Sequence, residues 1–248
     1  MSCINKKVVQ SRFHKASKRY DQFALMQRKS AKILTAQLRK FAPTFNPQTI
    51  LDVGAGTGFM PECLLEYYPH ANFSVNDIAP GMLDVATRKL RERGTQFECV
   101  LGDMEQVNFA KRDLIISNLA FQWAHKLNEL IASLYKKSKL LAFSTLLKGS
   151  LAEWDRVLVS HQLPPVERNY PDESSMVSLL DSLSHFNHFY VRKFQFYFPR
   201  NKSFIEHLKN TGTSALNTAV PISQFKQCLN SAKPLRVTYK IFFGIVGK

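Results

Sequence analysis

Between residues 49 and 147, short apolar runs alternate with stretches of helical periodicity, and this alternation restricts the fold more than any other feature. The predicted strands cover residues 50–53, 72–77, 96–101, 113–117 and 139–145. The predicted helices cover residues 59–68, 81–93 and 127–137. Such alternation predicts an α/β fold, a parallel sheet with helices on both faces. Ligands of these sheets bind beyond the carboxyl ends of the strands.

The segment before this alternation is predicted to be helical. Val9, Phe13 and Tyr20 recur at helical spacing, and Pro43 and Pro47 end the helical pattern. The chain therefore divides into an N-terminal helical segment (1–46), a core (47–148) and a C-terminal part of the same domain (149–248). With 248 residues and 45% hydrophobic content, it can bury a substantial core.

The C-terminal part lacks the regular alternation. Helices are predicted at residues 151–160, after Pro171 with Asp172 as a candidate N-cap, and at 203–209. Residues 189–198 and 237–246 are predicted strands, which we expect to pair as an antiparallel edge on the parallel sheet. The helical pieces near Pro171 and Phe204 are candidates for a lid.

The chain is strongly basic, with 34 Lys and Arg against 19 Asp and Glu and a formal net charge of +15. This charge points to an acidic partner such as nucleic acid, an anionic membrane surface or an acidic protein, unless it reflects genome bias or solubility alone. The four cysteines are scattered without metal-ligand spacing, and neither a signal-peptide run nor an apolar run of membrane-spanning length occurs. We expect a soluble cytoplasmic protein with reduced thiols and no metal.

Three features follow successive predicted strands, where a cofactor would bind. Glycines 54, 56 and 58 form a turn whose backbone can approach a ligand closely. Their alternating spacing does not match G-x-G-x-x-G, which weakens a dinucleotide interpretation. Asp77 can accept hydrogen bonds from both hydroxyls of a ribose. Asp103 can accept one from an exocyclic adenine amine, so the three together indicate an adenosyl cofactor.

The motifs at these positions resemble those of class I methyltransferases that use S-adenosylmethionine. They are Asp52-Val-Gly-Ala-Gly-Thr-Gly, Asn76-Asp-Ile-Ala-Pro-Gly-Met-Leu and Gly102-Asp-Met. The resemblance implies a Rossmann-like fold with a mostly parallel seven-stranded sheet, an antiparallel last strand, N-terminal helices and a helical lid. It also implies a set of cofactor-binding residues: Asp52, Gly54, Ala55, Gly56, Gly58, Asp77, Ile78, Met82, Asp103, Met104 and Asn118.

A closer resemblance covers nearly the whole chain. Residues 13–24 with Gln27, and residues 117–123, 143–151, 208–213 and 238–244, resemble the malonyl-acyl-carrier-protein O-methyltransferases of biotin synthesis. The chain departs from that family at Asn76 and Ala79, which flank Asp77 where the family more often has an apolar residue and Ser. Ala79 removes one hydroxyl contact, while Asp77 itself is in place.

The resemblance implies methyl transfer from S-adenosylmethionine to the free carboxylate of a malonyl thioester, carried by acyl-carrier protein or by coenzyme A. Simple carboxyl groups titrate near ~4, so this nucleophile is ionised at neutral pH and we assign no general base. Alignment and removal of water would supply catalysis. The N-terminal segment would close over the cofactor. Candidates for the substrate site and lid are Tyr20, Asn118, Gln122, Trp123 and His125.

Each candidate also has a purely structural interpretation. The ring of Tyr20 could face the sulfonium cation, or Tyr20 could be an ordinary core tyrosine. Gln122 and Trp123 could line the substrate channel or simply pack. We interpret His125 as a structural or substrate-shaping residue, since the reaction needs no base.

Two other functions fit parts of the sequence. One is methylation of another small acid or a quinone precursor. The other is an RNA methyltransferase, against which the chain lacks an Asn-Pro-Pro-Tyr-like motif and an RNA-binding module. We expect neither nucleic acid nor membrane as partner. An acidic carrier protein would suit the net charge of +15. Lys15, Lys18 and Arg19 are candidate contacts for it, and Arg192, Lys193 and Lys209 could each meet phosphate or an acidic surface.

Overall fold

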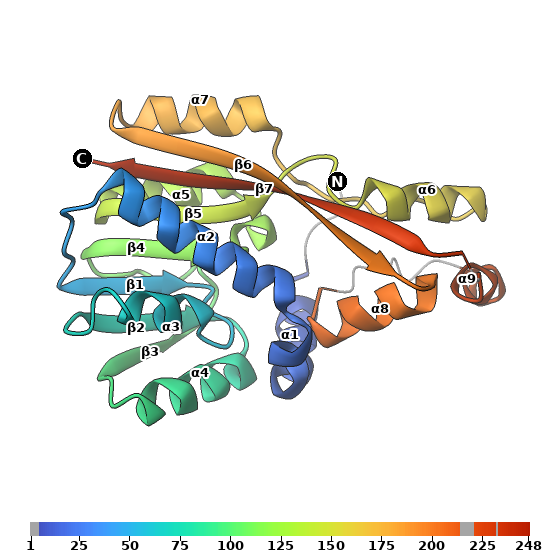
Figure 1. Ribbon diagram of the computed structural model, residues 1–248, viewed down its shortest axis with the longest axis horizontal. Coiled ribbons are helices and arrows are strands. Elements are labelled where there is room, and N and C mark those ends of the chain that lie inside the picture. Colours follow the sequence, from blue (N-terminus) through green and yellow to red (C-terminus); the bar gives the residue numbers. More distant parts are fainter. Residues whose placement is uncertain (1–4, 214–220, 232) are drawn as a thin grey trace.

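A computed structural model describes residues 5–213, 221–231 and 233–248, and its centre is one seven-stranded sheet (Figure 1). The strand order is β3-β2-β1-β4-β5-β7-β6. The strands are β1 (Thr49–Val53), β2 (Asn72–Asp77), β3 (Phe97–Leu101), β4 (Arg112–Asn118), β5 (Ser138–Leu146), β6 (Asn187–Phe198) and β7 (Leu235–Gly247). Neighbours from β3 to β5 pair in parallel, whereas β7 is antiparallel to both β5 and β6. The expected mixed sheet with an antiparallel last strand is confirmed.

The central strands are buried on both faces, which explains their continuous apolar runs. Ile50 of β1 pairs in register with Phe73 of β2 and Leu114 of β4. Successive side chains of a strand point to opposite faces, so Ile50 and Leu51 belong to two different core clusters. The sheet therefore separates two hydrophobic layers, each of which needs a cover of helices.

Helices cover both faces. The helices are α1 (Lys6–Phe23), α2 (Leu25–Phe41), α3 (Phe59–Leu65), α4 (Pro80–Glu92), α5 (Leu127–Lys136), α6 (Ala152–Ser160), α7 (Glu173–Leu183), α8 (Asn201–Asn210) and α9 (Ile222–Leu229), with a 3-10 turn at Phe121–Trp123. Helices α2 and α3 bury their apolar sides in the cluster that contains Ile50. Helices α5 and α7 bury theirs in the cluster that contains Leu51.

The N-terminal helical segment consists of two helices, α1 and α2. Helix α1 ends at Phe23, and the fully buried Ala24 donates its N–H to the carbonyl of Tyr20. Helix α2 then runs along the sheet, while α1 turns away and lies beyond the carboxyl ends of the strands (Figure 1). There α1 packs against α4 and α8. The break at Ala24 therefore places one face of α1 over the end of the sheet where ligands of such folds bind.

The two candidate lid helices occupy different places. Helix α7 buries Met176 and Leu180 against one face of the sheet and packs against β6, β7 and α5. For α7 the lid expectation does not fit, because its apolar side is used to cover the sheet. Asp172 caps α7 as expected, since its carboxylate accepts the N–H of Ser175 at 2.8 Å. Helix α8 instead packs against α1, close to the strand ends.

Three further features bear on the sequence expectations. Helix α9, which the sequence patterns did not indicate, packs against α8, and Asn201 donates to the carbonyl of Cys228. Cys63, Cys99 and Cys228 are free thiols, and Cys3 lies outside the described residues. Within the part of the chain that the structure describes, no helix is long and apolar enough to cross a membrane.

Candidate functional site

The glycine turn after β1 forms the floor of a cleft at the carboxyl ends of the strands, which we call the strand-end cleft. Gly54 has φ +70°, and a Cβ there would collide with Ala120, so the turn can pass Ala120 only with glycine at this position. Gly56 has φ +56°, but the space where its Cβ would lie is open. The turn therefore leaves room for a ligand directly above the backbone of Gly56.

Two buried carboxyl groups face this cleft. Asp77 Oδ2 accepts the backbone N–H of Gly56 at 2.9 Å, and Oδ1 accepts that of Ala79 at 2.8 Å. Burial raises the pKa of Asp77 to about 6, although these backbone hydrogen bonds counteract the shift. Asp52 is only 1% exposed, and within the described residues its two oxygens accept no hydrogen bond. Burial, followed by the nearby charge of Asp77, raises the pKa of Asp52 well above its ordinary value.

A buried carboxyl group without hydrogen bonds is costly, and a cation or a set of hydroxyl donors would remove that cost. A nucleoside with a positively charged amino-acid side arm, such as S-adenosylmethionine, offers both kinds of group. The ribose hydroxyls would donate to Asp77, and the positive charge would favour the ionised form of Asp52. The residues present thus fit this cofactor. Among the described residues, no cluster of His, Cys, Asp or Glu is arranged to hold a metal ion.

The far end of the strand-end cleft is closed by a lysine that sequence reasoning missed. Lys6 Nζ on α1 lies 3.0 Å from Asp103 Oδ1 and 2.7 Å from Glu105 Oε2. Burial alone would raise the pKa of Glu105, but hydrogen bonds from Lys6 and from the backbone N–H groups of His125 and Lys126 lower it to about 2. Asp103, predicted to meet adenine, is therefore also an anchor for the first turn of α1.

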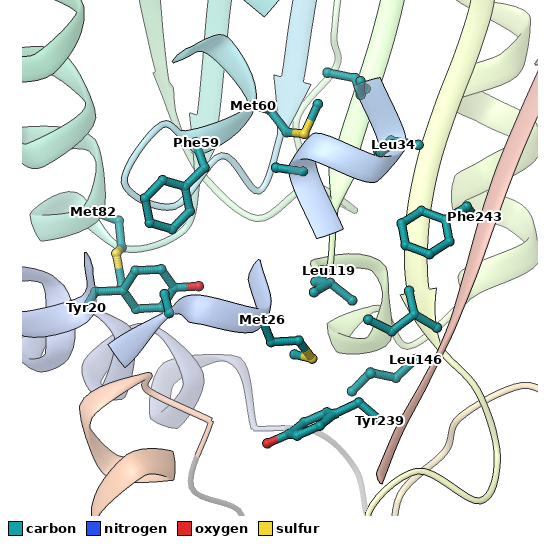
Figure 2. Packing of buried hydrophobic residues seen from close by; sticks show 14 of the residues in the cluster. Tyr20, Met26, Leu34, Phe59, Met60, Met82, Leu119, Leu146, Tyr239 and Phe243 are labelled. Carbon is teal, nitrogen blue, oxygen red and sulfur yellow. The ribbon is translucent and has the colours of Figure 1, made fainter. Parts of the chain in front are cut away.

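The other end of α1 is anchored by Asp21. Its carboxylate lies 2.6 Å from the hydroxyl of Thr57 in the glycine turn and 2.5 Å from Lys89 Nζ on α4. The ring of Tyr20 stacks on Phe59 with centroids 6.2 Å apart (Figure 2). Tyr20 is 8% exposed, and burial raises its pKa, so its hydroxyl stays protonated at neutral pH. Polar contacts at both ends thus hold α1 across the cleft.

A polar network at the ends of β4 and β5 connects the cleft to α2. Asn118 Nδ2 donates to the carbonyl of Gln27 at 3.1 Å, and Asn118 Oδ1 accepts from the hydroxyl of Ser144 at 2.9 Å. Leu119 has φ +53°, a region that is strained for a leucine, and its N–H is held by Ser144. Both Gln27 and Leu119 line the cleft, and within the described chain the buried Oε1 of Gln27 has no hydrogen-bond partner.

A second, larger cavity opens next to the first, and we call it the aromatic chamber. Its volume is about 490 Å³, within the range of small-molecule sites. It shares its boundary with the strand-end cleft, where both are lined by Val9, Phe13, Tyr20, Gln27, Leu119 and Trp123. Trp123 meets Phe13 edge-on with centroids 5.7 Å apart. The remaining walls come from distant segments, among them Trp154 on α6, Tyr170, Ile205 on α8 and Tyr239 on β7.

Most of the predicted site residues lie around these two cavities. Of the predicted cofactor set, all but Gly58 and Met82 line the strand-end cleft. Met82 is fully buried in the core, and Gly58 supports the turn at φ +87°, where a Cβ would press on Ala86. Tyr20 and Trp123 line both cavities, Asn118 lines the cleft, and Gln122 lines the chamber.

His125 differs from the other candidates. It is exposed and lines neither cavity, and Glu105 accepts its backbone N–H and the neighbouring N–H of Lys126. Its Nδ1 also lies 3.2 Å from Glu105 Oε2. The predicted role of His125 in shaping the substrate site is therefore not supported by its position.

Several lining residues were not predicted. Lys6, Gln27 and Arg168 contribute polar groups, but they lie on segments whose sequence patterns indicate only helix or loop. Lys6 and Gln27 could have been found as polar residues on the side of each helix where apolar residues recur. The predicted carrier-protein contacts Lys15, Lys18 and Arg19 are exposed on α1, and Arg192, Lys193 and Lys209 are exposed on β6 and α8.

Comparisons with known proteins agree with this geometry. A family model described as a methyltransferase domain matches residues 50–139. The chain is 31% identical over 250 residues to the malonyl-[acyl-carrier protein] O-methyltransferase of Neorickettsia risticii (strain Illinois), covering 100% of this chain and 99% of that one. It is 31% identical over 222 residues to the enzyme of the same name from Anoxybacillus flavithermus (strain DSM 21510 / WK1), covering 85% and 82%.

A solved structure supports the fold independently. The magnesium protoporphyrin IX methyltransferase from Synechocystis PCC 6803, crystallised with bound SAH, is similar with a TM-score of 0.63 and 14% identity. The similarity covers 98% of this chain and 100% of that one. The shared fold extends to the N-terminal helices and to the last strands, beyond the residues that the family model matches.

Proposed function

This chain belongs to the malonyl-[acyl-carrier protein] O-methyltransferase family, and from that premise we propose that it methylates the free carboxylate of a malonyl thioester. The methyl donor is S-adenosylmethionine, and the acceptor is malonyl-acyl-carrier protein, with malonyl-coenzyme A as the simpler alternative. The observation that carries the proposal is the junction of two cavities at Tyr20, Leu119 and Trp123. One cavity suits the donor and the other suits an acyl group on a long arm.

The donor is held by residues at three strand ends. Asp77 accepts the ribose hydroxyls, Asp103 lies at the adenine end, and the backbone above Gly56 leaves space for the nucleoside. Asp52 lies where the positively charged methionine part belongs, which accounts for a buried carboxyl group without internal hydrogen bonds. Helix α1 closes the cleft through Lys6 and Asp21.

The reaction requires alignment rather than proton transfer. When bound, S-adenosylmethionine would be held by Asp52, Asp77 and Asp103 and would supply the methyl group of its positively charged sulfur to the carboxylate oxygen, the C–S electron pair remaining on sulfur. The walls of Tyr20, Leu119 and Trp123 exclude water from the meeting point of the two cavities. The opposite charges neutralise each other, so a dry, weakly polar junction favours the transition state over the separated ions.

The chamber and the surface charge suit a carrier protein. An acyl-carrier protein is acidic and presents its cargo on a flexible arm, which can enter a cavity of this size. The net charge of +15 would steer such a partner, and Lys15, Lys18 and Arg19 on the exposed side of α1 are candidate contacts.

One assay tests the proposed function. Purified protein is incubated with labelled S-adenosylmethionine and, in parallel, with malonyl carrier protein, malonyl-coenzyme A, free malonate and RNA. We expect label on the malonyl thioesters as an ester that mild base removes. Label on RNA alone, or on none of the malonyl compounds, would overturn the proposal.

A further inference from the structure

The aromatic chamber is lined by a mostly buried cation whose ion pair with Asp155 engages only one of its nitrogens. Arg168 lines the chamber, and its side chain is 11% exposed. We propose that Arg168 binds the free carboxylate of the malonyl group, and that it thereby selects acidic over neutral acyl thioesters. This inference rests on the proposed function, because it names the group that recognises the acceptor of that reaction.

The guanidinium of Arg168 is fixed through one nitrogen. Nη1 donates to Asp155 Oδ2 at 2.6 Å and to the carbonyl of Val166 at 3.3 Å. Asp155 also accepts the N–H of Val166 through Oδ1 at 3.2 Å, so α6 and the segment that carries Arg168 are tied together. Nε and Nη2 make no hydrogen bond within the described residues. A guanidinium held in this way keeps donors in a planar arrangement that matches a carboxylate.

The neighbours of Arg168 suit a small acidic group. Tyr170 and Tyr239 line the same chamber, and the charge of Arg168 acts on both hydroxyls. Burial raises the pKa of Tyr170 to about 12, so that hydroxyl remains a donor at neutral pH. Burial likewise raises the pKa of Tyr239. Neither hydroxyl makes a hydrogen bond to the described part of the protein, and each can donate to a carboxylate or thioester oxygen.

The position of Tyr239 connects this group to the junction of the cavities. Tyr239 belongs to the same packed cluster as Tyr20, Met26 and Leu119, and Figure 2 shows it beneath Met26 and Leu119 with Tyr20 beside them. Tyr20 and Leu119 line both cavities. The carboxylate oxygen is itself the methyl acceptor, so Arg168 and Tyr239 must hold it where the chamber meets the strand-end cleft.

The chemistry predicts a particular kinetic signature. The carboxylate carries a full negative charge before transfer, a partial charge in the transition state and none in the methyl ester. Arg168 therefore stabilises bound substrate more than the transition state. It should therefore lower KM and slightly lower kcat, and its attraction disappears from the product. A residue that only supports the fold would not separate the two constants in this way.

The first experiment measures steady-state methylation of malonyl carrier protein by the full chain. For Arg168→Met we expect KM to rise about 10- to 100-fold, which is the loss of a charge-assisted pair, with kcat within about threefold of wild type. Arg168→Lys should lie between them. The matched control is Arg156→Met, which removes the same charge from an exposed position on α6 and should leave both constants unchanged.

The second experiment reads binding without turnover. With S-adenosylhomocysteine present, wild type should bind malonyl carrier protein at least tenfold more tightly than acetyl carrier protein, and Arg168→Met should remove this preference. Equal weakening of both ligands would overturn the proposal and assign Arg168 to the phosphate of the carrier arm or to the fold. A malonyl-specific loss in Arg12→Met but not in Arg168→Met would assign the carboxylate to Arg12, which also lines the chamber.

Failure of the proposed function and failure of the proposed role of Arg168 give different results. If wild type forms no ester on malonyl carrier protein, the proposed function fails, whatever Arg168 does. If Arg168→Met does not fold, Arg168→Lys and Asp155→Asn can be measured instead. Arg168→Lys keeps the positive charge but loses the planar guanidinium, and Asp155→Asn keeps Arg168 but removes the charge of its partner. We expect an intermediate rise in KM for each, and unchanged KM in both variants would overturn the proposal.

Discussion

The two cavities of the site are built in different ways. The strand-end cleft is made mainly by the turns that follow β1, β2 and β3, and three acids, Asp52, Asp77 and Asp103, line it. The aromatic chamber is assembled from α1, α6, β7, α8 and the segment before α7, and the mostly buried Arg168 lines it. A cofactor shared by many enzymes is bound by short local motifs, whereas the acceptor is recognised by elements that meet only in the folded chain.

This contrast makes substitutions in the two cavities separable. Changes in the strand-end cleft should alter the affinity for S-adenosylmethionine, and changes in the chamber should alter the KM of the acceptor. Residues at the junction should alter both.

The largest effect is expected at Asp77. Asp77→Ala removes the acceptor of two ribose hydroxyls, and we expect about 100-fold weaker binding of S-adenosylmethionine by calorimetry. Asp84→Ala, which removes an exposed carboxylate from α4, is the matched control and should bind normally. Unchanged affinity in Asp77→Ala, with the fold intact by circular dichroism, would mean that the ribose lies elsewhere.

A substitution at the junction of the two cavities should change both the cofactor affinity and the acceptor KM. Trp123 lines both cavities and packs edge-on against Phe13. Trp123→Ala should weaken cofactor binding and raise the acceptor KM, each by about tenfold, because one aromatic wall is lost from both. Calorimetry and steady-state kinetics on the same preparation measure the two effects. A change in only one of them would assign Trp123 to a single cavity.

The pH dependence of cofactor binding tests the strand-end cleft without involving the aromatic chamber. Burial raises the pKa of Asp77 to about 6, and the ionised form is the better acceptor for ribose hydroxyls. Below pH 6 the cofactor must displace a proton, so affinity at pH 5 should be about tenfold lower than at pH 8. Asp77→Asn should bind more weakly at pH 8 and lose part of this dependence. A flat profile in the wild type would show that Asp77 does not ionise on binding.

The same shift has the opposite sign for folding. Because the folded protein holds the proton on Asp77 more tightly than the unfolded chain does, this contribution to stability is present below about pH 4 and is lost as pH rises through 6. The cofactor should therefore raise the melting temperature more at pH 8 than at pH 5. That difference comes from the cleft and needs no contribution from the chamber.

The smallest effect is expected at Lys6, which ties α1 to Asp103 and Glu105. Lys6→Gln should weaken S-adenosylmethionine binding about threefold, since a partly exposed ion pair contributes roughly 0.2–1 kcal/mol. Lys7→Gln, on the exposed side of α1, is the control. Tighter binding in Lys6→Gln would instead show that Lys6 competes with adenine for Asp103.

The residues that the sequence assigned to the cofactor gather mostly around one cleft, because their signals are local. A glycine turn, Asp77 and Asp103 each follow an apolar run, and parallel strands bring such ends together in any sheet of this type. Met82 and His125 line neither cavity, because a motif indicates which residues are near a site but not the direction of their side chains. Met82 points into the core, and His125 is exposed.

The sequence alone therefore determined the sheet, its antiparallel last strand, the three strand-end features and, through its motifs, the family. The tertiary structure decided how the chain breaks at Ala24 so that α1 lies across the cleft, and that α7 covers the sheet while α8 borders the chamber. It also decided that Arg168 and Tyr239 from β7 line the same chamber. The physical reason is the distance along the chain over which each kind of signal acts. Periodicity and turn chemistry act over a few residues, whereas a cavity wall depends on packing between segments far apart in the chain, and its polar members are recognisable only once those segments are in contact.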